Sequence, residues 1–220
     1  MEKINLVKFI DHTLLKPEAT LDDIKRLCEE AIKYKFFAVC VAPPFVSFTK
    51  DILKDYEIKV ATVIGFPLGY NLTKTKIFEA KECIKSGADE IDMVINIGML
   101  KSKNYNYIFN EINSVKNEIG DKILKVIIET SLLTQDEKII ASSLVKAAGA
   151  DFVKTSTGFS QGGATKEDIE LIKKVVGDNF GIKASGGIRT FKQAIELIEA
   201  GANRIGTSSS VKIIEEYGNN

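Results

Sequence analysis

Two lysines each end an apolar run of the sequence, Lys154 in FVKTSTGF and Lys183 in GIKASGGIR. The aromatic and β-branched residues before each lysine favour a strand, and the serine, threonine and glycine residues after it favour a loop. A lysine at the end of a buried strand lies at the mouth of a site instead of on a solvated surface. Because lysine is abundant in this chain, this context makes each of the two a candidate amine nucleophile, whereas the residue type alone does not.

A lysine attacks a carbonyl group only as the neutral amine, and its ordinary pKa of about 10.4 leaves only a trace of that form at pH 7. A second ammonium group nearby lowers the pKa because it disfavours the charged form. Lys183, on the next predicted strand, is the expected neighbour of Lys154. Two such lysines predict Schiff-base chemistry, in which the iminium charge withdraws electrons and lets an adjacent carbon–carbon bond break or form.

The elements that must hold these residues follow from an alternation of apolar runs and amphipathic segments. Near-continuous apolar strands separated by helices are typical of a parallel sheet that helices cover. No Pro/Gly/Ser-rich linker divides the 220 residues, which favours one domain, residues 1–220. We therefore predict an α/β fold, a single (β/α)8 TIM barrel. Its eight expected strands lie within residues 8–15, 36–42, 58–66, 89–97, 123–130, 150–155, 180–185 and 203–208.

Helix starts are indicated by threonines that are followed three residues later by an acidic residue or a glutamine. These pairs are structural signals and carry no catalytic weight. They are Thr20 with Asp23, Thr134 with Glu137, Thr165 with Asp168, and Thr190 with Gln193.

A weak repeat relates three helix-to-strand junctions, SGADEID (86–92), AGADFVK (148–154) and AGANRIG (200–206). In each, the glycine is expected to end the helix in a left-handed conformation, with the strand beginning two residues later. The fifth residue after the glycine is Asp92, Lys154 or Gly206, and a degenerate copy, KFFAVC, places Cys40 at the same phase. On alternate strands these four should point into the barrel. The preceding residues should face the helices: Val39, Ile91, Val153 and Ile205.

Asp92 is therefore expected near both lysines, with Gly206 leaving space beside them. Asp92 and Lys183, bridged by hydroxyl groups or water, would move the protons that carbinolamine formation, its dehydration and enamine protonation require. The alternative interpretation is a structural ion pair between Asp92 and Lys154 inside the barrel.

The last two strand ends indicate what the substrate carries. In barrels of this kind a phosphate often binds to backbone N–H groups in the loops after strands 7 and 8. Gly186 and Gly187 follow the seventh predicted strand, and Ser208 and Ser209 follow the eighth and precede an expected helix over 211–217. We predict a phosphate site there; the alternatives are a plain turn and a plain helix cap.

Composition excludes several other classes of function. Lys plus Arg and Asp plus Glu both number 30, so the net charge of zero provides no basic field for nucleic acid or an anionic membrane. His12 is the single histidine and the three cysteines form no CxxC pair, so neither a zinc site nor a disulfide framework is indicated. We interpret His12 as a hydrogen-bonded structural residue, with polarisation of a substrate oxygen as the alternative. Without a signal-like start or a long apolar run, we predict a cytoplasmic protein that acts on a small molecule.

The same segments carry a resemblance to the deoxyribose-phosphate aldolase family of Schiff-base (class I) aldolases. The resemblance implies reversible cleavage of 2-deoxy-D-ribose 5-phosphate to D-glyceraldehyde 3-phosphate and acetaldehyde, without a metal or an organic cofactor. The matching segments are IDHTLLKP (10–17), CVAP (40–43), VIGFPLG (63–69), GADEIDMVINIG (87–98), KVIIET (125–130), FVKTSTGF (152–159), IKASGGIR (182–189) and RIGTSS (204–209).

Residue by residue, the resemblance implies that Lys154 forms the Schiff base and that Asp92 and Lys183 are the proton-transfer pair. It also implies a homo-oligomer, a dimer or a tetramer. The remaining expected contacts fall in two groups. Those to phosphate are Gly186, Gly187, Ser208 and Ser209, and those to the rest of the substrate are Asp11, Cys40, Thr155 and Gly158.

The chain departs from the family pattern at Phe159, where some members have a lysine that approaches the phosphate, and in its short tail, where the reach of Tyr217 is open. Two other functions remain possible at this point. One is a different Schiff-base aldolase or a transaldolase-like enzyme that uses the same lysine. The other is a barrel that binds a sugar phosphate without turning it over.

Overall fold

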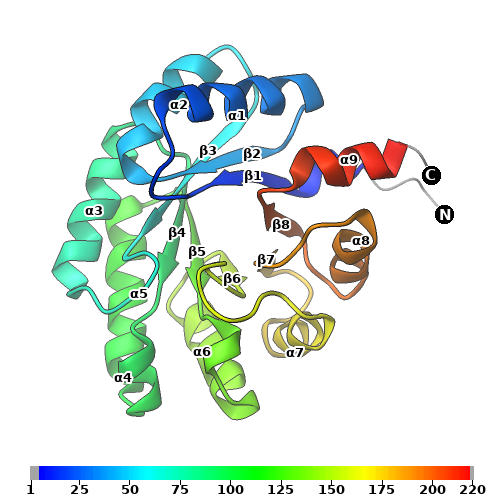
Figure 1. Ribbon diagram of the computed structural model, residues 1–220. Helices are drawn as coiled ribbons and strands as arrows, with labels where there is room; N and C mark the ends of the chain where they lie inside the picture. The colour runs from blue at the N-terminus through cyan, green and yellow to red at the C-terminus, as the bar shows by residue number, and fades with distance from the viewer. Residues whose placement is uncertain (1–4, 219–220) are drawn as a thin grey trace.

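The computed structural model describes residues 5–218, and they form a closed barrel of eight parallel strands in sequence order (Figure 1). Pairing of the first strand with the last closes the sheet. This confirms the predicted TIM barrel, and each strand lies inside its predicted run. The strands are β1 (Ile10–Leu14), β2 (Ala38–Val41), β3 (Lys59–Ile64), β4 (Glu90–Val94), β5 (Ile123–Ile127), β6 (Phe152–Lys154), β7 (Gly181–Ser185) and β8 (Arg204–Thr207).

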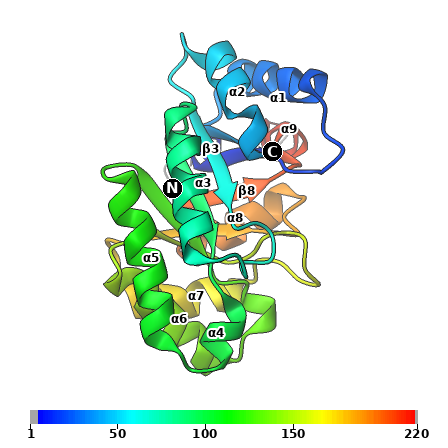
Figure 2. The same cartoon turned by 90° about the vertical axis from the view of Figure 1, so that its left-hand side faces the viewer.

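Helices surround the barrel on the outside, and α3 and α5 lie side by side in both views (Figures 1 and 2). None of the helices formed by residues 5–218 has the length and apolar character needed to cross a membrane. The α-helices are α1 (Leu21–Tyr34), α2 (Val46–Leu53), α3 (Thr73–Lys85), α4 (Ile97–Lys101), α5 (Tyr105–Ile119), α6 (Gln135–Ala147), α7 (Lys166–Val176), α8 (Phe191–Glu199) and α9 (Ser210–Gly218). Short 3-10 helices are η1 (Leu6–Phe9), η2 (Pro43–Phe45) and η3 (Thr130–Leu132).

All four predicted threonine caps are confirmed. Thr20, Thr134 and Thr190 form reciprocal capping boxes with the residue three positions later. Thr165 accepts a hydrogen bond from the backbone N–H of Asp168. Side-chain oxygens therefore satisfy backbone donors that a helix start leaves without an intrahelical partner.

The predicted repeat is confirmed, with one correction to where the strands begin. Gly87, Gly149 and Gly201 have φ of 104°, 85° and 120°, and Lys35 takes the equivalent left-handed position with φ of 58°. Each strand begins three residues after this position, not two. The physical reason is that the residue just before the strand uses its side chain to bond a neighbouring strand. The three side-chain bonds are from Val60 N–H to Asp89, from Leu124 N–H to Asp151, and from Ile182 N–H to Asn203.

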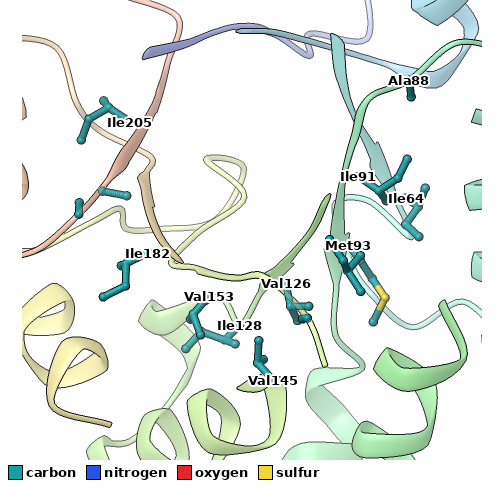
Figure 3. Packing of buried hydrophobic residues seen from close by; sticks show 14 of the residues in the cluster. Ile64, Ala88, Ile91, Met93, Val126, Ile128, Val145, Val153, Ile182 and Ile205 are labelled. Carbon is teal, nitrogen blue, oxygen red and sulfur yellow. The ribbon is translucent and has the colours of Figure 1, made fainter. Parts of the chain in front are cut away.

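The main hydrophobic core lies between the barrel and the helices. Ile91, Val153, Ile182 and Ile205 point away from the barrel interior toward this layer (Figure 3). Val39 belongs to the same buried layer, so the four residues that the repeat predicted to face the helices are confirmed there: Val39, Ile91, Val153 and Ile205. The apolar cluster of Cys40, Ala61 and Val63 is separate from that layer, which leaves much of the remaining barrel interior to charged side chains.

Candidate active site

The three residues expected to carry the chemistry meet inside the barrel. Lys154 pairs with Lys183 in the register of β6 and β7, and Asp92 projects from β4. Oδ2 of Asp92 lies 2.8 Å from Nζ of Lys154 and 2.8 Å from Nζ of Lys183. The contact is direct and does not use the hydroxyl or water bridge that the sequence suggested. All three side chains are buried.

Asp92 also belongs to a closed cycle of ion pairs, which we call the charge ring. In this cycle three carboxylates alternate with three cations, and every carboxylate bridges two cations. The successive contacts are Asp92–Lys125 at 2.7 Å, Lys125–Glu90 at 2.6 Å, Glu90–Arg204 at 3.0 Å, Arg204–Asp11 at 2.8 Å, Asp11–Lys183 at 2.5 Å and Lys183–Asp92 at 2.8 Å.

Sequence reasoning did not identify Lys125, Glu90 or Arg204. Strand alternation contained a signal for two of them, since Glu90 precedes Asp92 by two residues and Arg204 precedes Gly206 by two. Residues with that spacing point to the same face of a sheet. A charged residue two positions from an inward site residue is therefore expected to point inward as well.

Electrostatics distinguish the two lysines. Burial lowers the pKa of Lys154 below its ordinary value; Asp92 opposes this and the charge of Lys183 adds to it. Burial also opposes the charge of Lys183, but Asp11 and Asp92 outweigh it and raise the pKa of Lys183. Lys154 is therefore the amine that loses its proton more readily, while Lys183 stays an ammonium group.

The carboxylate between them stays ionised. Burial opposes the charge of Asp92, but the three ammonium groups around it outweigh burial and hold its pKa well below the ordinary value of 3.8. Asp92 is therefore ionised at neutral pH, and its two oxygens accept hydrogen bonds from the surrounding amines.

A cavity of about 350 Å³ opens above Lys154 at the ends of β1, β6, β7 and β8. Five of the predicted site residues line it: Lys154, Gly158, Gly186, Gly187 and Ser208. The others lie outside its wall. Asp92, Lys183, Asp11 and Cys40 are buried side chains of the strands. Thr155 bonds the backbone of Ser185 with its hydroxyl, and Ser209 donates its N–H to Thr207.

Gly206 leaves space for Lys183, as predicted. A Cβ atom at position 206 would lie 2.9 Å from Cε of Lys183 and 3.2 Å from Cβ of Ser185. Any side chain at this position would displace the lysine that bonds Asp92.

The wall formed by the loops after β7 and β8 suits an anion. Gly186 and Gly187 adopt φ of 85° and 75°, a conformation that glycine allows without strain. Two exposed cations that the sequence analysis did not identify, Lys16 and Arg189, line the same cavity. Both lie in segments that carry the resemblance, IDHTLLKP and IKASGGIR, but no role was expected for them, because their approach to the cavity depends on how the β1 and β7 loops fold over the barrel.

Phe159 and Tyr217, the two departures from the family pattern, occupy different surroundings. Phe159 lines the cavity and packs edge-on against Phe66 at 5.2 Å between ring centroids. Tyr217 packs against Phe191, with 5.3 Å between ring centroids. The last helix, α9, begins at Ser210, one residue before the predicted start.

His12 has the structural role that we favoured from the sequence. Its Nδ1 lies 2.9 Å from Oγ of Ser210 and its Nε2 lies 2.7 Å from Oε2 of Glu30, so it joins β1 to α1 and α9. Burial lowers the pKa of His12, against the opposing effect of Glu30. Across residues 5–218, no group of histidine, cysteine and acidic side chains has an arrangement that could hold a metal ion.

Comparison with known proteins agrees with the motifs. Residues 6–215 match the family described as DeoC/LacD family aldolase. The deoxyribose-phosphate aldolase of Thermococcus kodakarensis is 59% identical over 220 residues, which cover 98% of both chains. That of Caldanaerobacter subterraneus subsp. tengcongensis is 57% identical over 217 residues, 97% of this chain and 94% of the relative.

Solved structures extend the agreement to three dimensions. An aldolase called QR15 superposes with a TM-score of 0.95 and 41% identity, covering 99% of this chain and 97% of that one. The tetrameric deoxyribose phosphate aldolase from Aeropyrum pernix superposes with a TM-score of 0.89 and 32% identity, covering 97% and 91%. Because family model, relatives and structures all match over nearly its whole length, the chain belongs to the DeoC/LacD family of aldolases.

Proposed function

We propose that the protein catalyses reversible aldol cleavage of 2-deoxy-D-ribose 5-phosphate to D-glyceraldehyde 3-phosphate and acetaldehyde through a Schiff base on Lys154. One observation carries this proposal. The amine of Lys154 lines a cavity with a glycine-rich loop, and Asp92 and Lys183 lie directly behind it. Relatives at up to 59% identity that are named deoxyribose-phosphate aldolases support the choice of substrate.

In the cleavage direction, neutral Lys154 attacks the aldehyde carbon C1 of the open-chain sugar phosphate, and the resulting carbinolamine loses water to give an iminium ion. The C2–C3 bond then breaks; its electrons move into an enamine and the C3 hydroxyl loses its proton, which releases D-glyceraldehyde 3-phosphate. Protonation of the enamine at C2 and hydrolysis release acetaldehyde and restore the amine.

Lys183 and Asp92 are proposed to move these protons. Asp11 and Asp92 raise the pKa of Lys183 against the effect of burial and so keep it protonated, with a proton to donate to the departing hydroxyl group of the carbinolamine. Asp92 touches both amines through one oxygen and so offers a direct route between them.

The phosphate is proposed to bind where the cavity wall is formed by Gly186, Gly187 and Ser208, with Ser209 nearby. The two glycines let backbone N–H groups approach the phosphate oxygens. Lys16 and Arg189 supply positive charge to the same cavity, which suits an anion at a position where Phe159 provides none. The remaining proposed substrate contacts are Asp11, Cys40, Thr155 and Gly158.

We further propose one domain over residues 1–220, a homo-oligomer, and a cytoplasmic location without a metal or organic cofactor. The tetrameric neighbour supports association. So do four large apolar side chains that are more than half exposed in or near α3: Leu68, Tyr70, Leu72 and Phe78. Three free cysteines fit a reducing compartment. Light scattering measures the oligomer, and full activity in EDTA is the expected result without a metal.

Borohydride treatment in the presence of 2-deoxyribose 5-phosphate, followed by peptide mapping by mass spectrometry, tests the proposed function. We expect an adduct on Lys154 and none in the Lys154→Ala variant. Product analysis with acetaldehyde or dihydroxyacetone as the donor separates this reaction from another Schiff-base aldolase. Binding of the sugar phosphate without an adduct or turnover would contradict the proposal and indicate a binding protein.

A further inference from the structure

The positive and negative charges of the charge ring are equal in number, and Lys154 is not one of its members. Three carboxylates and three cations alternate around the ring, so its formal charge is zero. Lys154 contacts the ring only through Asp92, which already bridges Lys125 and Lys183. If protonated, Lys154 would be a fourth cation for three carboxylates in a buried site.

Two members of the ring form no ion pair with Lys154, Asp92 or Lys183. Glu90 bonds Lys125 and Arg204, and Arg204 bonds Glu90 and Asp11. The guanidinium of Arg204 also lies 3.8 Å from the ring centroid of Phe37, which holds it in place. Glu90 and Arg204 therefore form the part of the ring that lies farthest from Lys154 along the cycle of ion pairs.

We propose that Glu90 and Arg204 are positioning residues that set the charge of the Lys154 amine from a distance and in opposite directions: Arg204 disfavours its protonated form and Glu90 favours it. Together they hold the charge ring balanced and leave Lys154 as the surplus cation. This inference rests on the proposed role of Lys154 as the nucleophile. According to this inference, the distant ion pair of Glu90 and Arg204 helps to determine which buried amine can attack a carbonyl group.

The physical basis is that a buried charge without its own counter-charge is costly, so the group with the weakest pairing gives up its charge first. The directions of the shifts agree: burial lowers the pKa of Lys154, whereas carboxylate neighbours outweigh burial and raise the pKa of each cation in the ring. A change of charge at Glu90 or Arg204 therefore shifts the electrostatic potential at Lys154, although neither residue touches it.

Among residues 5–218, no charged side chain other than Lys154 forms an ion pair with a member of the charge ring from outside it. From β2, Cys40 faces the site, and burial raises the pKa of its thiol, which therefore stays uncharged. From β3, Ala61 and Val63 contribute no charge. Glu129, after β5, accepts hydrogen bonds from Thr157 in the loop after β6. The charged groups on the remaining strands are Lys154 and the six members of the charge ring.

We expect removal of the charge of Glu90 and removal of the charge of Arg204 to shift the pKa of Lys154 in opposite directions. Glu90→Gln leaves the charge ring with one excess positive charge, so the protonated form of Lys154 is disfavoured further and its apparent pKa falls by about one unit. Arg204→Met leaves one excess negative charge, so the apparent pKa of Lys154 rises by about one unit. The double variant restores balance and should return the value to near that of the wild type. Arg204→Lys keeps the charge and serves as the matched control.

The experiment measures the initial rate at which acetaldehyde is trapped on Lys154 by cyanoborohydride, as a function of pH, with the full-length protein and peptide mapping. An adduct on Lys154 in the wild type establishes the nucleophile independently of the ring. Opposite shifts in the single variants and recovery in the double variant support the inference. The inference is overturned if the pH midpoints of the two single variants shift in the same direction or do not shift, or if the double variant does not recover the wild-type midpoint. None of these results would contradict the proposed function.

Folding is checked by circular dichroism before each titration. Arg204→Met leaves Asp11 and Glu90 with one cation fewer each and is the variant most exposed to unfolding. If Arg204→Met does not fold, the other two variants still test the inference. It requires a lower pH midpoint of trapping in Glu90→Gln and a return to the wild-type midpoint in the double variant.

Discussion

The amines of Lys154 and Lys183 lie on adjacent strands at 2.8 Å from the same oxygen of Asp92. Two ammonium groups on one carboxylate oxygen repel each other, so one proton is held less firmly than the other. Asp11 decides which one, because it pairs with Lys183 at 2.5 Å and has no contact with Lys154. The geometry thereby favours loss of the proton from Lys154 and its retention by Lys183, the two states that their proposed roles require.

Replacing Lys154 by alanine should abolish cleavage of 2-deoxyribose 5-phosphate and leave the fold intact. The variant loses the cavity-lining amine that is bonded to Asp92, and it removes a buried cation that has no carboxylate of its own. Steady-state assays together with thermal melting check both parts. Measurable cleavage by the folded variant would show that another residue is the nucleophile.

Lys183→Leu should reduce kcat by about 100-fold or more, since a positioned general acid contributes about that much. Binding of inorganic phosphate should be retained, because Lys183 does not line the cavity. Inhibition of the wild type and of the variant by phosphate, measured beside kcat, provides the comparison. A wild-type kcat in this variant would rule out Lys183 as the proton donor.

Gly206→Ala should reduce kcat by about tenfold or more, because small displacements of a catalytic group are costly. The added Cβ would lie 2.9 Å from Cε of Lys183, so the amine must move away from Asp92. Gly98→Ala is the matched control, since its Cβ would meet only Oδ1 of Asn96 at 3.5 Å. Equal kcat values for the two variants would argue against the spacing role of Gly206.

Arg189→Gln should raise KM for 2-deoxyribose 5-phosphate by about tenfold, the equivalent of one charge-assisted hydrogen bond, with little change in kcat. Activity toward unphosphorylated 2-deoxyribose should not change, because the guanidinium would no longer have an anion to bind. Arg26→Gln, an exposed arginine on α1, is the control. Equal loss for both substrates would place the effect of Arg189 elsewhere than at the phosphate.

Asp11→Asn should lower the free energy of unfolding at pH 7 by about 3 kcal/mol, since it breaks two buried ion pairs. Burial opposes the charge of Asp11, but Lys183 and Arg204 outweigh it and hold its pKa below the ordinary value of 3.8. A carboxyl group with a lowered folded pKa stabilises the fold fully above its unfolded pKa and loses that contribution as the pH falls toward the folded value.

The wild type should therefore lose stability as the pH falls below about 4, and Asp11→Asn should lose less over the same range. Urea unfolding at about pH 7, 4 and 3 measures this difference. Asp55→Asn, at an exposed position, is the control and should follow the wild type. Parallel stability curves for the wild type and Asp11→Asn would contradict the assignment of this acid sensitivity to Asp11.

The pattern of residue types over a few neighbouring positions was sufficient to predict the barrel and part of its site. Threonine caps, left-handed glycines and apolar strands depend on a few neighbouring residues, and so does the phase that points Asp92 and Lys154 to one side. The starts of three strands were wrong by one residue, because Asp89, Asp151 and Asn203 use their side chains to bond a neighbouring strand. That partner is distant in sequence, so local pattern contains no sign of it.

The sequence by itself thus determined the fold class, the two strand-end lysines and the carboxylate expected beside them. Only the tertiary structure decided which of the two lysines is the weaker base, because the answer depends on a cycle of ion pairs. That cycle joins Glu90 on β4 to Arg204 on β8 and closes through Asp11 on β1, residues up to 193 positions apart in the chain. Coulomb interactions depend on distance in space, and closure of the barrel sets those distances.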